Sequence, residues 1–424
     1  MTDPLPIQPC GPIDGVIRPP GSKSITNRAL VCAALADGTS VLDGVLDSDD
    51  TRVMIAGLRA LGFRVTHDPD ERRARVSGRG GRIPSSGAEI DVAASGTTVR
   101  FLTALVTLGH GRFRLDGTPR MRERPIRDLI DALAQLGAHV VDEDSTGCPP
   151  VCVHAKGLPG GRAEVAGDIS SQFLSGVLMA APASQGPVEL VVSGEVVSKP
   201  YVVMTLAVMR AFGVDVPSEG LRRFVFGGRQ RYKARAYEIE PDASAASYFF
   251  AAAAITGGVV RVEGLSRDSL QGDVGLCDCL ERMGCRVDYE PGQITVRSGP
   301  LRGIDVDMNA ISDTVQTLAA VALFADGATS IRNVAHMRHK ETDRLAALAT
   351  ELRRFGAEVD ERPDGLTITP RPLHGATVDT YDDHRMAMSL ALVGLRVPGV
   401  AIRDPGCTAK TYPKFFDDLA LVSV

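Results

Sequence analysis

Length, composition and charge exclude several classes of protein. The chain has 424 residues, of which 44% are hydrophobic and 23% are charged, and its formal net charge is -5. This balance excludes a disordered chain and a polybasic nucleic-acid coat, so any basic site must be local. The length exceeds that of one ordinary core and predicts more than one domain.

Targeting, membrane and metal signals are weak in this sequence. Residues 1–10 show no basic stretch followed by an apolar core, and we therefore predict a cytoplasmic protein. The longest uncharged run, 243–260, contains serine, threonine and glycine, which indicates a buried helix and a turn rather than a membrane segment. The eight cysteines and eight histidines are scattered, so we expect reduced thiols and no metal site.

One pattern recurs along the chain: an Ala-rich apolar stretch, a strand-like run, an amphipathic helix, and a glycine leading into a second strand. The glycine positions are separated by 75, 76, 71 and 72 residues, a spacing too regular to arise by chance. They occur in Leu61-Gly62-Phe63, Leu136-Gly137-Ala138, Phe212-Gly213-Val214, Met283-Gly284-Cys285 and Phe355-Gly356-Ala357.

The Ala-rich stretches recur in step with these glycines, and there are six of them. Each has Ser, Asp or Gly just before an apolar run, which is typical of helix N-caps, and the runs are apolar almost all round, which indicates interior helices. They begin at Gly21-Ser22-Lys23-Ser24, Ser95-Gly96-Thr97, Asp168-Ile169-Ser170-Ser171, Asp242-Ala243-Ser244, Ser312-Asp313-Thr314 and Asp382-Asp383-His384.

Six such units favour two similar α/β domains of three units each, because one unit of roughly 70 residues is too small to be stable alone. The second helix of each unit is one-sided, as in 126–136 and 345–355, and should lie outside. Helix N-termini that point at one place would form an anion site. The alternative is that the caps only prevent fraying.

Cations fall near the predicted helix starts. Lys23 and Arg28 lie at the start of the first interior helix, where a buried cation needs an anion. The segment 21–24 resembles the end of a phosphate-binding loop, but the earlier glycine is missing, which argues against a nucleotide kinase. Guanidinium and ammonium groups suit carboxylates and phosphates, although each cation alone is more often solvated. The others are Arg100, Arg120, Arg122, Arg124, Lys199, Lys340, Arg344, Arg385 and Lys410.

Six motifs in this order resemble the 5-enolpyruvylshikimate-3-phosphate synthase family, from about Ile17 to Tyr412. Members of that family join shikimate 3-phosphate to the enolpyruvyl group of phosphoenolpyruvate and release phosphate. The motifs are Pro20-Gly21-Ser22-Lys23-Ser24-Ile25-Thr26-Asn27-Arg28-Ala29, Arg122-Glu123-Arg124-Pro125-Ile126, Ser170-Ser171-Gln172-Phe173, Ser198-Lys199-Pro200-Tyr201, Lys340-Glu341-Thr342-Asp343-Arg344 and Asp383-His384-Arg385-Met386-Ala387-Met388.

The resemblance implies a role for each matching residue, and no cofactor or metal. Asp313 would accept the proton of the attacking hydroxyl, and Glu341, helped by Lys23, would handle the proton at the methylene carbon. The shikimate 3-phosphate side would comprise Lys23, Ser24, Arg28, Ser170, Ser171, Gln172, Ser198, Tyr201, Asp313, His336 and Lys340. The phosphoenolpyruvate side would comprise Lys23, Gly96, Arg124, Gln172, Arg344, Arg385 and Lys410.

These residue types fit the chemistry that the resemblance implies. Protonating a carbon and adding a hydroxyl needs an acid and a base, here two carboxylates in separate repeats. One charge pair at about 4 Å is worth on the order of 4 kcal/mol at an effective dielectric near 20, so several cations are needed to hold two anions that repel each other. Alternatively, Glu341 is only a surface partner of Arg344 at i, i+3.

The chain departs from the family near Gly96. The family usually has Gly-Asn where this chain has Ala93-Ala94, Phe101 replaces a proline of many relatives, and His336 stands where some have asparagine. In this family the herbicide glyphosate occupies the phosphoenolpyruvate site beside that glycine. We therefore expect the altered wall to weaken glyphosate binding more than substrate binding.

The resemblance also implies an architecture of two domains, each built from three βαβαββ units with inner helices. Residues 1–20 with 241–424 would form one domain, completed by the N-terminal strand, and residues 21–240 the other, with the active site in the cleft between them. Substrate binding would close the domains of a protein expected to be a monomer.

Three rival functions remain open. A UDP-N-acetylglucosamine enolpyruvyl transferase normally carries a Cys in its catalytic loop, and residues 118–130 have none. An RNA 3'-phosphate cyclase is disfavoured by the acidic balance, so we expect no nucleic-acid partner. A non-catalytic anion-binding repeat protein would need the cations but neither Asp313 nor Glu341.

Overall fold

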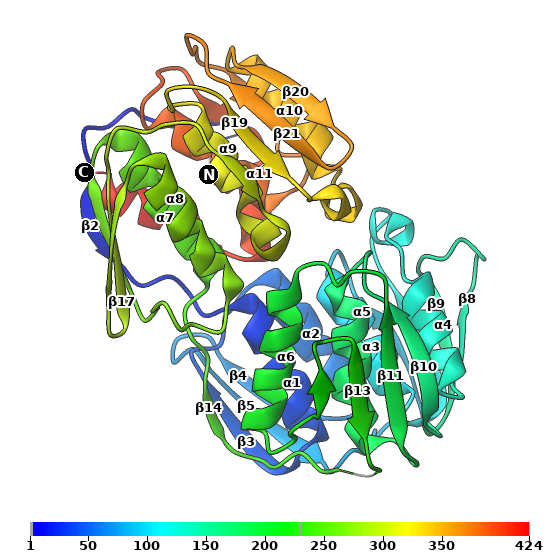
Figure 1. The fold of residues 1–424 in the computed structure, drawn as a ribbon. Coiled ribbons are helices and arrows are strands. Elements are labelled where there is room, and N and C mark those ends of the chain that lie inside the picture. Colours follow the sequence, from blue (N-terminus) through cyan, green and yellow to red (C-terminus); the bar gives the residue numbers. More distant parts are fainter. Residues whose placement is uncertain (1–2, 229, 424) are drawn as a thin grey trace. The chain divides into compact units, whose positions relative to one another are not determined.

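The computed structural model describes residues 3–228 and 230–423, and the chain divides into two compact units. The first unit runs from Gly21 to Ile239. The second unit joins Met1–Pro20 to Glu240–Val424. In each unit, helices pack against small β-sheets (Figure 1).

The first unit contains three four-stranded sheets of the same construction. In each sheet the first two strands in order run parallel and the others pair antiparallel. The sheet orders are β14-β3-β5-β4, β6-β7-β9-β8 and β10-β11-β13-β12. The strands are β3 (Asp37–Asp43), β4 (Arg64–Asp68), β5 (Arg73–Arg79), β6 (Gly87–Asp91), β7 (His110–Asp116), β8 (His139–Asp142), β9 (Val151–Lys156), β10 (Gly161–Ala166), β11 (Val188–Ser193), β12 (Ser218–Glu219), β13 (Arg223–Phe226) and β14 (Ala236–Glu238).

Two kinds of helix alternate in the first unit. The helices α1, α3 and α5 are buried along nearly their whole length, whereas α2 and α4 bury one face only. Their bounds are α1 (Lys23–Leu35), α2 (Asp49–Ala60), α3 (Gly96–Val106), α4 (Arg127–Gln135), α5 (Ser171–Ala180) and α6 (Lys199–Ala211), with 3-10 helices η1 (Met121–Glu123) and η2 (Ala181–Ala183). This confirms the predicted division into inner and outer helices.

The second unit repeats the plan, and the N-terminal segment supplies two of its strands. β2 pairs parallel with β15, and β1 pairs antiparallel with β23 in a three-stranded sheet. The sheet orders are β16-β17-β15-β2, β18-β19-β21-β20 and β1-β23-β22. The strands are β1 (Leu5–Pro6), β2 (Asp14–Ile17), β15 (Val259–Glu263), β16 (Arg286–Glu290), β17 (Gln293–Arg297), β18 (Asp305–Asp307), β19 (Thr329–Arg332), β20 (Glu358–Arg362), β21 (Gly365–Thr369), β22 (Thr377–Val378) and β23 (Ala401–Ile402).

The helices of the second unit again include three buried ones, α7, α9 and α11, which pack against one another. Residues 243–256 form α7 inside the protein, as predicted, and Gly257 ends it with a left-handed backbone. The helices are α7 (Ala243–Thr256), α8 (Leu276–Met283), α9 (Val315–Ala322), α10 (Arg344–Arg354), α11 (His384–Gly394) and α12 (Phe415–Val422), with η3 (Gly272–Gly275), η4 (Asn309–Thr314), η5 (Ala335–His339) and η6 (Pro405–Lys410).

The predicted N-caps are confirmed at five inner helices and wrong at one. Ser22, Ser95, Ser170, Asp242 and Asp383 each accept a hydrogen bond from a backbone N–H of the first turn. Before α9 the chain instead forms the 3-10 helix η4. Thr314 does not cap α9, because its hydroxyl donates to the carbonyl of Ile311.

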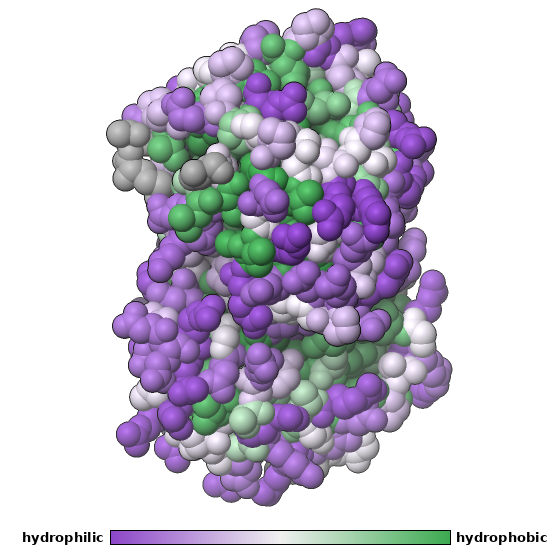
Figure 2. Space-filling view, turned by 90° about the vertical axis from the view of Figure 1, so that its left-hand side faces the viewer, coloured by the Kyte–Doolittle hydropathy of each residue, from purple (hydrophilic) through white to green (hydrophobic). Residues whose placement is uncertain are grey.

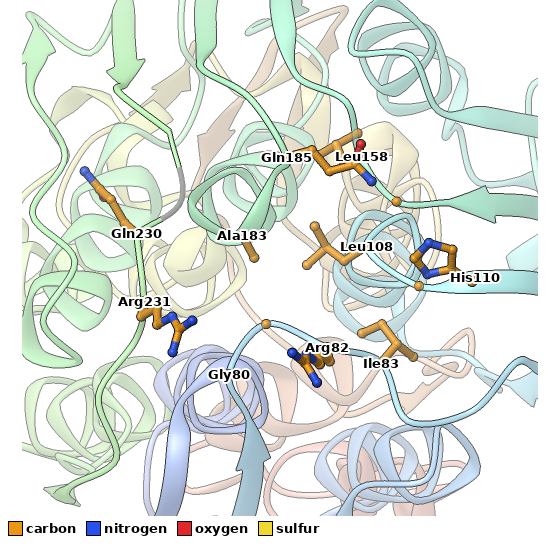
Figure 3. A pocket seen from close by; sticks show the side chains of 13 residues that line it. Gly80, Arg82, Ile83, Leu108, His110, Leu158, Ala183, Gln185, Gln230 and Arg231 are labelled. Atoms are coloured by element: carbon orange, nitrogen blue, oxygen red, sulfur yellow. The ribbon is translucent and has the colours of Figure 1, made fainter.

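A cavity of about 370 Å³ in the first unit lies at the C-terminal ends of the inner helices. The N–H groups of Gly80 and Gly81 donate to the last carbonyls around the end of α1. Leu108 follows α3, and Ala183 is the last residue of η2 (Figure 3). The inner helices begin about 15–20 Å away, given 1.5 Å per residue. No residue predicted for the substrate site lines this cavity.

A second cavity, of about 410 Å³, is formed in the second unit by the N-terminal segment and α12. Apolar side chains gather on the surface of this unit (Figure 2). Val16 and Leu421 are among the exposed apolar residues of the unit. This cavity is lined by residues 5–10, 395, 416, 417, 419, 420 and 423, which again include no predicted site residue.

Phe249 of α7 provides a test of the second core. Its buried ring lies 6.1 Å from the Tyr412 ring and 6.2 Å from the Phe415 ring, centroid to centroid. We expect Phe249→Ala to lower the free energy of unfolding by about 3–5 kcal/mol, measured by urea unfolding with circular dichroism. The matched control Leu421→Ala removes a side chain that is 73% exposed and should cost less than about 0.5 kcal/mol. Equal losses in the two variants would contradict the inner position of α7.

Candidate functional site

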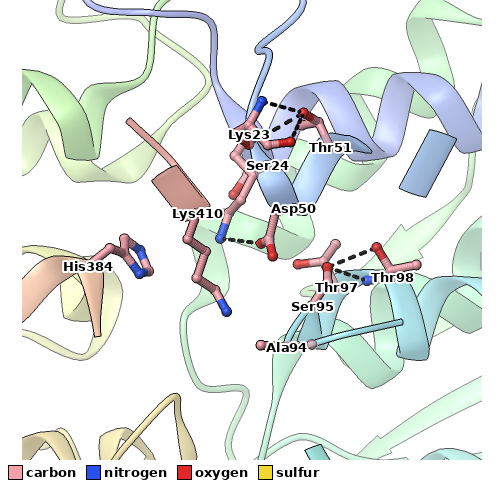
Figure 4. Close-up of polar contacts among 12 residues, drawn as sticks. Lys23, Ser24, Asp50, Thr51, Ala94, Ser95, Thr97, Thr98, His384 and Lys410 are labelled. Atoms are coloured by element: carbon pink, nitrogen blue, oxygen red, sulfur yellow. Dashed lines mark hydrogen bonds and ion pairs between the residues drawn. The ribbon is translucent and has the colours of Figure 1, made fainter. Parts of the chain in front are cut away.

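Lys23 opens the first half of the candidate site. It is the first residue of α1, and its Nζ lies 3.2 Å from Oδ2 of Asp50, a buried carboxylate in the first turn of α2 (Figure 4). Anions are favoured near a helix N-terminus, so Asp50 is stabilised by its own helix as well as by Lys23. The ammonium of Lys23 is thereby fixed at the N-terminal end of the inner helices.

Two arginines surround the start of α3. Arg100 donates to Oε1 of Gln172 at 2.9 Å, and Arg124 donates to the carbonyl of Ala94 at 3.3 Å. Gly96 lies between the two guanidinium groups. A Cβ on Gly96 would come within 2.5 Å of Nη1 of Arg100 and 2.6 Å of Nη2 of Arg124, so any larger residue would displace them.

The turn before Gly96 is strained. Ala93 has a φ of 45°, in the left-handed region that residues with a Cβ rarely adopt. Its N–H donates to Asp91 at 2.8 Å, and its carbonyl accepts from the N–H of Thr118 at 3.1 Å. These bonds hold the turn, and the next carbonyl, of Ala94, then contacts Arg124.

The Arg28 side chain is buried inside the protein rather than exposed at its surface. Its guanidinium donates to Thr205 at 2.7 Å, to the carbonyl of Ser24 at 2.9 Å and to the carbonyl of Tyr201 at 3.2 Å. The Phe101 ring lies 5.2 Å from the guanidinium carbon. Burial lowers the pKa of Arg28 to about 10, so it stays charged at neutral pH.

The remaining predicted residues of this unit lie at the starts of α5 and α6. Ser170 accepts from the N–H of Gln172, whose side-chain amide donates to Thr97 at 3.3 Å. Ser171 is the first residue of α5 and is buried. Ser198 precedes α6 with a left-handed backbone, and Tyr201 lies in that helix's first turn.

Arg344 organises the second half of the candidate site. It is 2% exposed and donates to three carboxylates: Asp383 at 2.7 Å, Glu341 at 2.9 Å and Asp313 at 3.3 Å. Charge from these partners outweighs burial and raises the pKa of Arg344. The predicted pair of Glu341 and Arg344 therefore exists, but it is largely buried, with 12% of the Glu341 side chain exposed.

Two more cations complete this half. Arg385, the second residue of α11, donates to Oδ2 of Asp313 at 2.8 Å, and Nζ of Lys410 lies 3.6 Å from Oε1 of Glu341. Each of the two carboxylates thus contacts two cations, one of which is Arg344. Contact with cations favours the ionised form of a carboxyl group.

His336 and Lys340 lie beside this cluster. His336 is within η5, and Lys340 directly follows the last residue of that helix. Burial, followed by the charge of Lys340, lowers the pKa of His336 to about 3. The imidazole is therefore neutral at physiological pH, and it can offer a hydrogen bond but no positive charge.

The structure thus gathers the predicted residues into two groups, one in each unit. Three other cations that the sequence placed at similar turns are surface residues instead. Arg120 pairs with Glu123, Arg122 with Asp116, and Lys199 with Glu195, all in exposed ion pairs.

Sequence reasoning missed several residues that contact the predicted ones. Asp50 had a usable signal, since it occupies the start of an outer helix beside an interior helix that carries Lys23. The sequence indicated Asp383 as an N-cap, but its contact with Arg344 joins two residues that are 39 positions apart, at the starts of two different helices. Asp273, described below, lies in a short 3-10 helix and had no sequence signal.

Among residues 3–228 and 230–423, no group of His, Cys, Asp and Glu is arranged to hold a metal ion. Within the same residues, no helix is long and apolar enough to cross a membrane.

Comparison with known proteins gives a family match over nearly the whole chain. A model of the EPSP synthase (3-phosphoshikimate 1-carboxyvinyltransferase) family matches residues 7–419. The chain is 50% identical over 407 residues to the 3-phosphoshikimate 1-carboxyvinyltransferase of Nostoc punctiforme, covering 96% of this chain and 95% of that protein. It is 49% identical over 419 residues to the protein of the same name from Shewanella denitrificans, covering 98% of each.

Solved structures show the same fold. EPSP synthase from Acinetobacter baumannii matches with a TM-score of 0.84 at 24% identity, covering 100% of this chain and 98% of that one. The enolpyruvyl transferase NikO from Streptomyces tendae matches with a TM-score of 0.77 at 22% identity, covering 100% and 98%. The predicted α/β fold of repeated βαβαββ units with inner helices is confirmed.

The left-handed turn at Ala93 predicts an unusual stability effect. A left-handed residue with a Cβ stores about 1–3 kcal/mol of strain, which exceeds the entropy that glycine adds to the unfolded chain. We therefore expect Ala93→Gly to raise the free energy of unfolding by about 0.5–1 kcal/mol in thermal denaturation. The control Ala94→Gly, at a neighbour without positive φ, should lower it. Destabilisation by both would show that Ala93 is not strained.

Proposed function

The chain belongs to the EPSP synthase (3-phosphoshikimate 1-carboxyvinyltransferase) family, and we propose that its two groups of residues together transfer the enolpyruvyl group of phosphoenolpyruvate to the 5-hydroxyl of shikimate 3-phosphate. The protein is a transferase of the shikimate pathway, which leads to the aromatic amino acids. One observation carries the mechanism: Asp313 and Glu341 share the guanidinium of Arg344, and each contacts one further cation.

Asp313 is the proposed base. Its two oxygens accept from Arg344 and Arg385, so it stays ionised and its position is fixed. A fixed carboxylate is suited to take a proton from a hydroxyl, provided that the hydroxyl comes within hydrogen-bond reach. The hydroxyl oxygen then adds to the central carbon of the enolpyruvyl group, while the methylene carbon gains a proton.

Glu341 is the proposed partner for the proton at the methylene carbon. Arg344 and Lys410 favour its ionised form while no substrate is bound. An anionic substrate accepts hydrogen bonds that these two cations would otherwise donate to Glu341. The ionised form of Glu341 is then less stabilised, so its proton affinity rises at the stage at which it must deliver a proton. Phosphate then leaves with the proton that Asp313 had taken from the hydroxyl, and Glu341 removes one proton from the new methyl group, which completes the transfer without a covalent bond to the protein.

The residues that bind each substrate are proposed from the family resemblance and from the observed grouping of their side chains. Arg344, Arg385 and Lys410 form one group with Asp313 and Glu341, which supports a shared role in binding phosphoenolpyruvate. Gly96, Arg124 and Gln172 adjoin one another around Arg100 in the first unit, which supports the same side. Lys23, Ser24, Ser170, Ser171, Ser198, Tyr201, His336 and Lys340 remain the proposed residues for shikimate 3-phosphate.

Arg28 has a more indirect part in this proposal. Its guanidinium already donates to the carbonyls of Ser24 and Tyr201, two residues proposed to bind the shikimate ring. Its first contribution is therefore to hold those segments in place, and a direct contact with substrate would share the donors that it already uses.

Neither unit carries the full set of groups that the reaction needs. The proposed acid and base belong to the second unit, whereas Lys23, Arg124 and Gln172 belong to the first. Two anions must be held together against their repulsion, so we propose that substrates engage both units and close them around the reaction.

The compartment and the oligomeric state also belong to this proposal. The eight cysteines are free thiols, which supports the reducing environment of the cytoplasm. The expected monomer remains a prediction that light scattering of the purified protein tests directly.

Three substitutions test the site. Asp313→Ala, Lys23→Met and Arg124→Ala should each lower turnover by about 100-fold or more, as for loss of one preorganised group. The assay is phosphate release that depends on both shikimate 3-phosphate and phosphoenolpyruvate. Wild-type turnover in folded Asp313→Ala would refute its role as the base.

Matched controls separate these losses from general effects of charge. Arg122→Ala removes an exposed arginine two residues from Arg124, and Asp305→Asn neutralises an exposed carboxylate of the second unit. Both should keep turnover within about 2-fold of wild type, because surface substitutions of this kind have small effects.

Glyphosate provides a test of the wall at Ala93 and Ala94. The carbonyl of Ala94 contacts Arg124, so the strained turn influences a proposed phosphoenolpyruvate residue. We expect the double variant Ala93→Gly, Ala94→Asn to be inhibited by about 10-fold less glyphosate than wild type, a difference of about 1.4 kcal/mol in binding. The KM for phosphoenolpyruvate should change much less. Equal inhibition of the two proteins would contradict the proposal.

A further inference from the structure

A buried carboxylate, Asp273, lies behind the proposed base. It belongs to the short helix η3, is 4% exposed, and accepts a hydrogen bond from the hydroxyl of Ser244. Ser244 is itself buried in the first turn of α7. Asp273 therefore acts on its surroundings through Ser244.

Ser244 connects Asp273 to Arg385. Nη2 of Arg385 donates to Oγ of Ser244 at 3.4 Å and to Oδ2 of Asp313 at 2.8 Å. A serine hydroxyl has one proton, and when Asp273 accepts it the oxygen presents its lone pairs to Arg385. Asp273 thus sets the direction of the Ser244 hydroxyl, and with it one of the contacts that hold Arg385.

Tyr248 completes the attachment of Arg385. Nη1 of Arg385 donates to its hydroxyl oxygen at 3.4 Å. Burial raises the pKa of Tyr248 to about 12, so this oxygen stays protonated and neutral at physiological pH. The guanidinium thus contacts two neutral hydroxyls as well as the Asp313 carboxylate, and its orientation, together with Arg344, fixes the position of that carboxylate.

Charged groups act on Asp273 from three neighbouring elements. Asp313 lies on η4, Arg385 on α11, and Asp242 at the start of α7. Burial, followed by the charge of Asp313, raises the pKa of Asp273 to about 7, against opposing effects of Arg385 and Ser244.

We propose that Asp273 is a positioning residue for the transfer reaction: through Ser244 it directs Arg385 onto Asp313. This inference rests on the proposed function, in which Asp313 accepts the substrate proton. Asp273 itself touches neither substrate in the proposal, and its effect passes through two side chains.

The test compares the pH dependence of kcat/KM in wild type, Asp273→Asn and Asp273→Ala. Asparagine keeps an acceptor for Ser244 but removes the negative charge. Asp273→Asn should therefore keep kcat near wild type, and its acidic limb should overlay that of wild type because Asp273 is itself neutral at that pH. Asp273→Ala removes the acceptor as well and should lower kcat by about 10-fold, because Arg385 is then no longer held in the orientation that contacts Asp313.

Two further variants keep the test decisive. Ser244→Ala breaks the link with the loss of one hydroxyl and should also lower kcat by about 10-fold, even if the Asp273 variants fail to fold. Asp142→Asn is the matched control, since Asp142 is a buried carboxylate of the first unit that pairs with Arg127. Its pH profile should overlay that of wild type.

Stability gives an independent readout of the same group. The unfolded chain releases the Asp273 proton near the ordinary value of 3.8, whereas the folded chain keeps it until about pH 7. The contribution of this group to stability therefore falls as pH rises through that window, and Asp273→Asn should remove that part of the slope.

The outcomes separate this inference from the proposed function. If Asp313→Ala is inactive while Asp273→Asn, Asp273→Ala and Ser244→Ala match wild type in kcat and in pH profile, the positioning role is overturned and the function stands. If Asp313→Ala is fully active, the function fails, whatever the Asp273 variants do.

Discussion

The buried guanidinium of Arg344 is the interaction on which the second half of the site depends. It donates to Asp313 in η4, to Glu341 in the loop between η5 and α10, and to Asp383, the residue before α11. A buried charge is tolerated only when it is paired and hydrogen-bonded, so these contacts are required for folding as well as for chemistry. The same bonds fix two carboxylates at defined positions, which is the arrangement an acid and a base need.

The two halves differ in their balance of charge. In the first unit, Lys23, Arg100 and Arg124 adjoin the carboxylate of Asp50 and several neutral oxygens. In the second, the cations contact carboxylates that are themselves proposed to react. The first half therefore presents cations that few carboxylates neutralise, whereas the cations of the second half contact carboxylates. This division suits the proposed function, in which two anions are bound while Asp313 and Glu341 each exchange a proton with a substrate.

The departures from the family now have physical descriptions. Ala93 occupies a left-handed turn suited to glycine, and Phe101 packs on the Arg28 guanidinium. His336 is neutral because it is buried beside Lys340, so it differs from asparagine in shape more than in charge. The protein thus retains the cations and carboxylates of the site while changing the backbone and packing around them.

The sequence by itself determined the repeat, the inner helices and most of the N-caps, because these depend on local periodicity and on short-range capping bonds. It also pointed to the cations, through motifs that a family shares. Only the tertiary structure decided that Arg122 is a surface residue while Arg124 is buried, and that Asp50, Asp383 and Asp273 join the site. Such contacts join residues far apart in the chain, and a side chain's partner across that distance is set by packing rather than by local pattern.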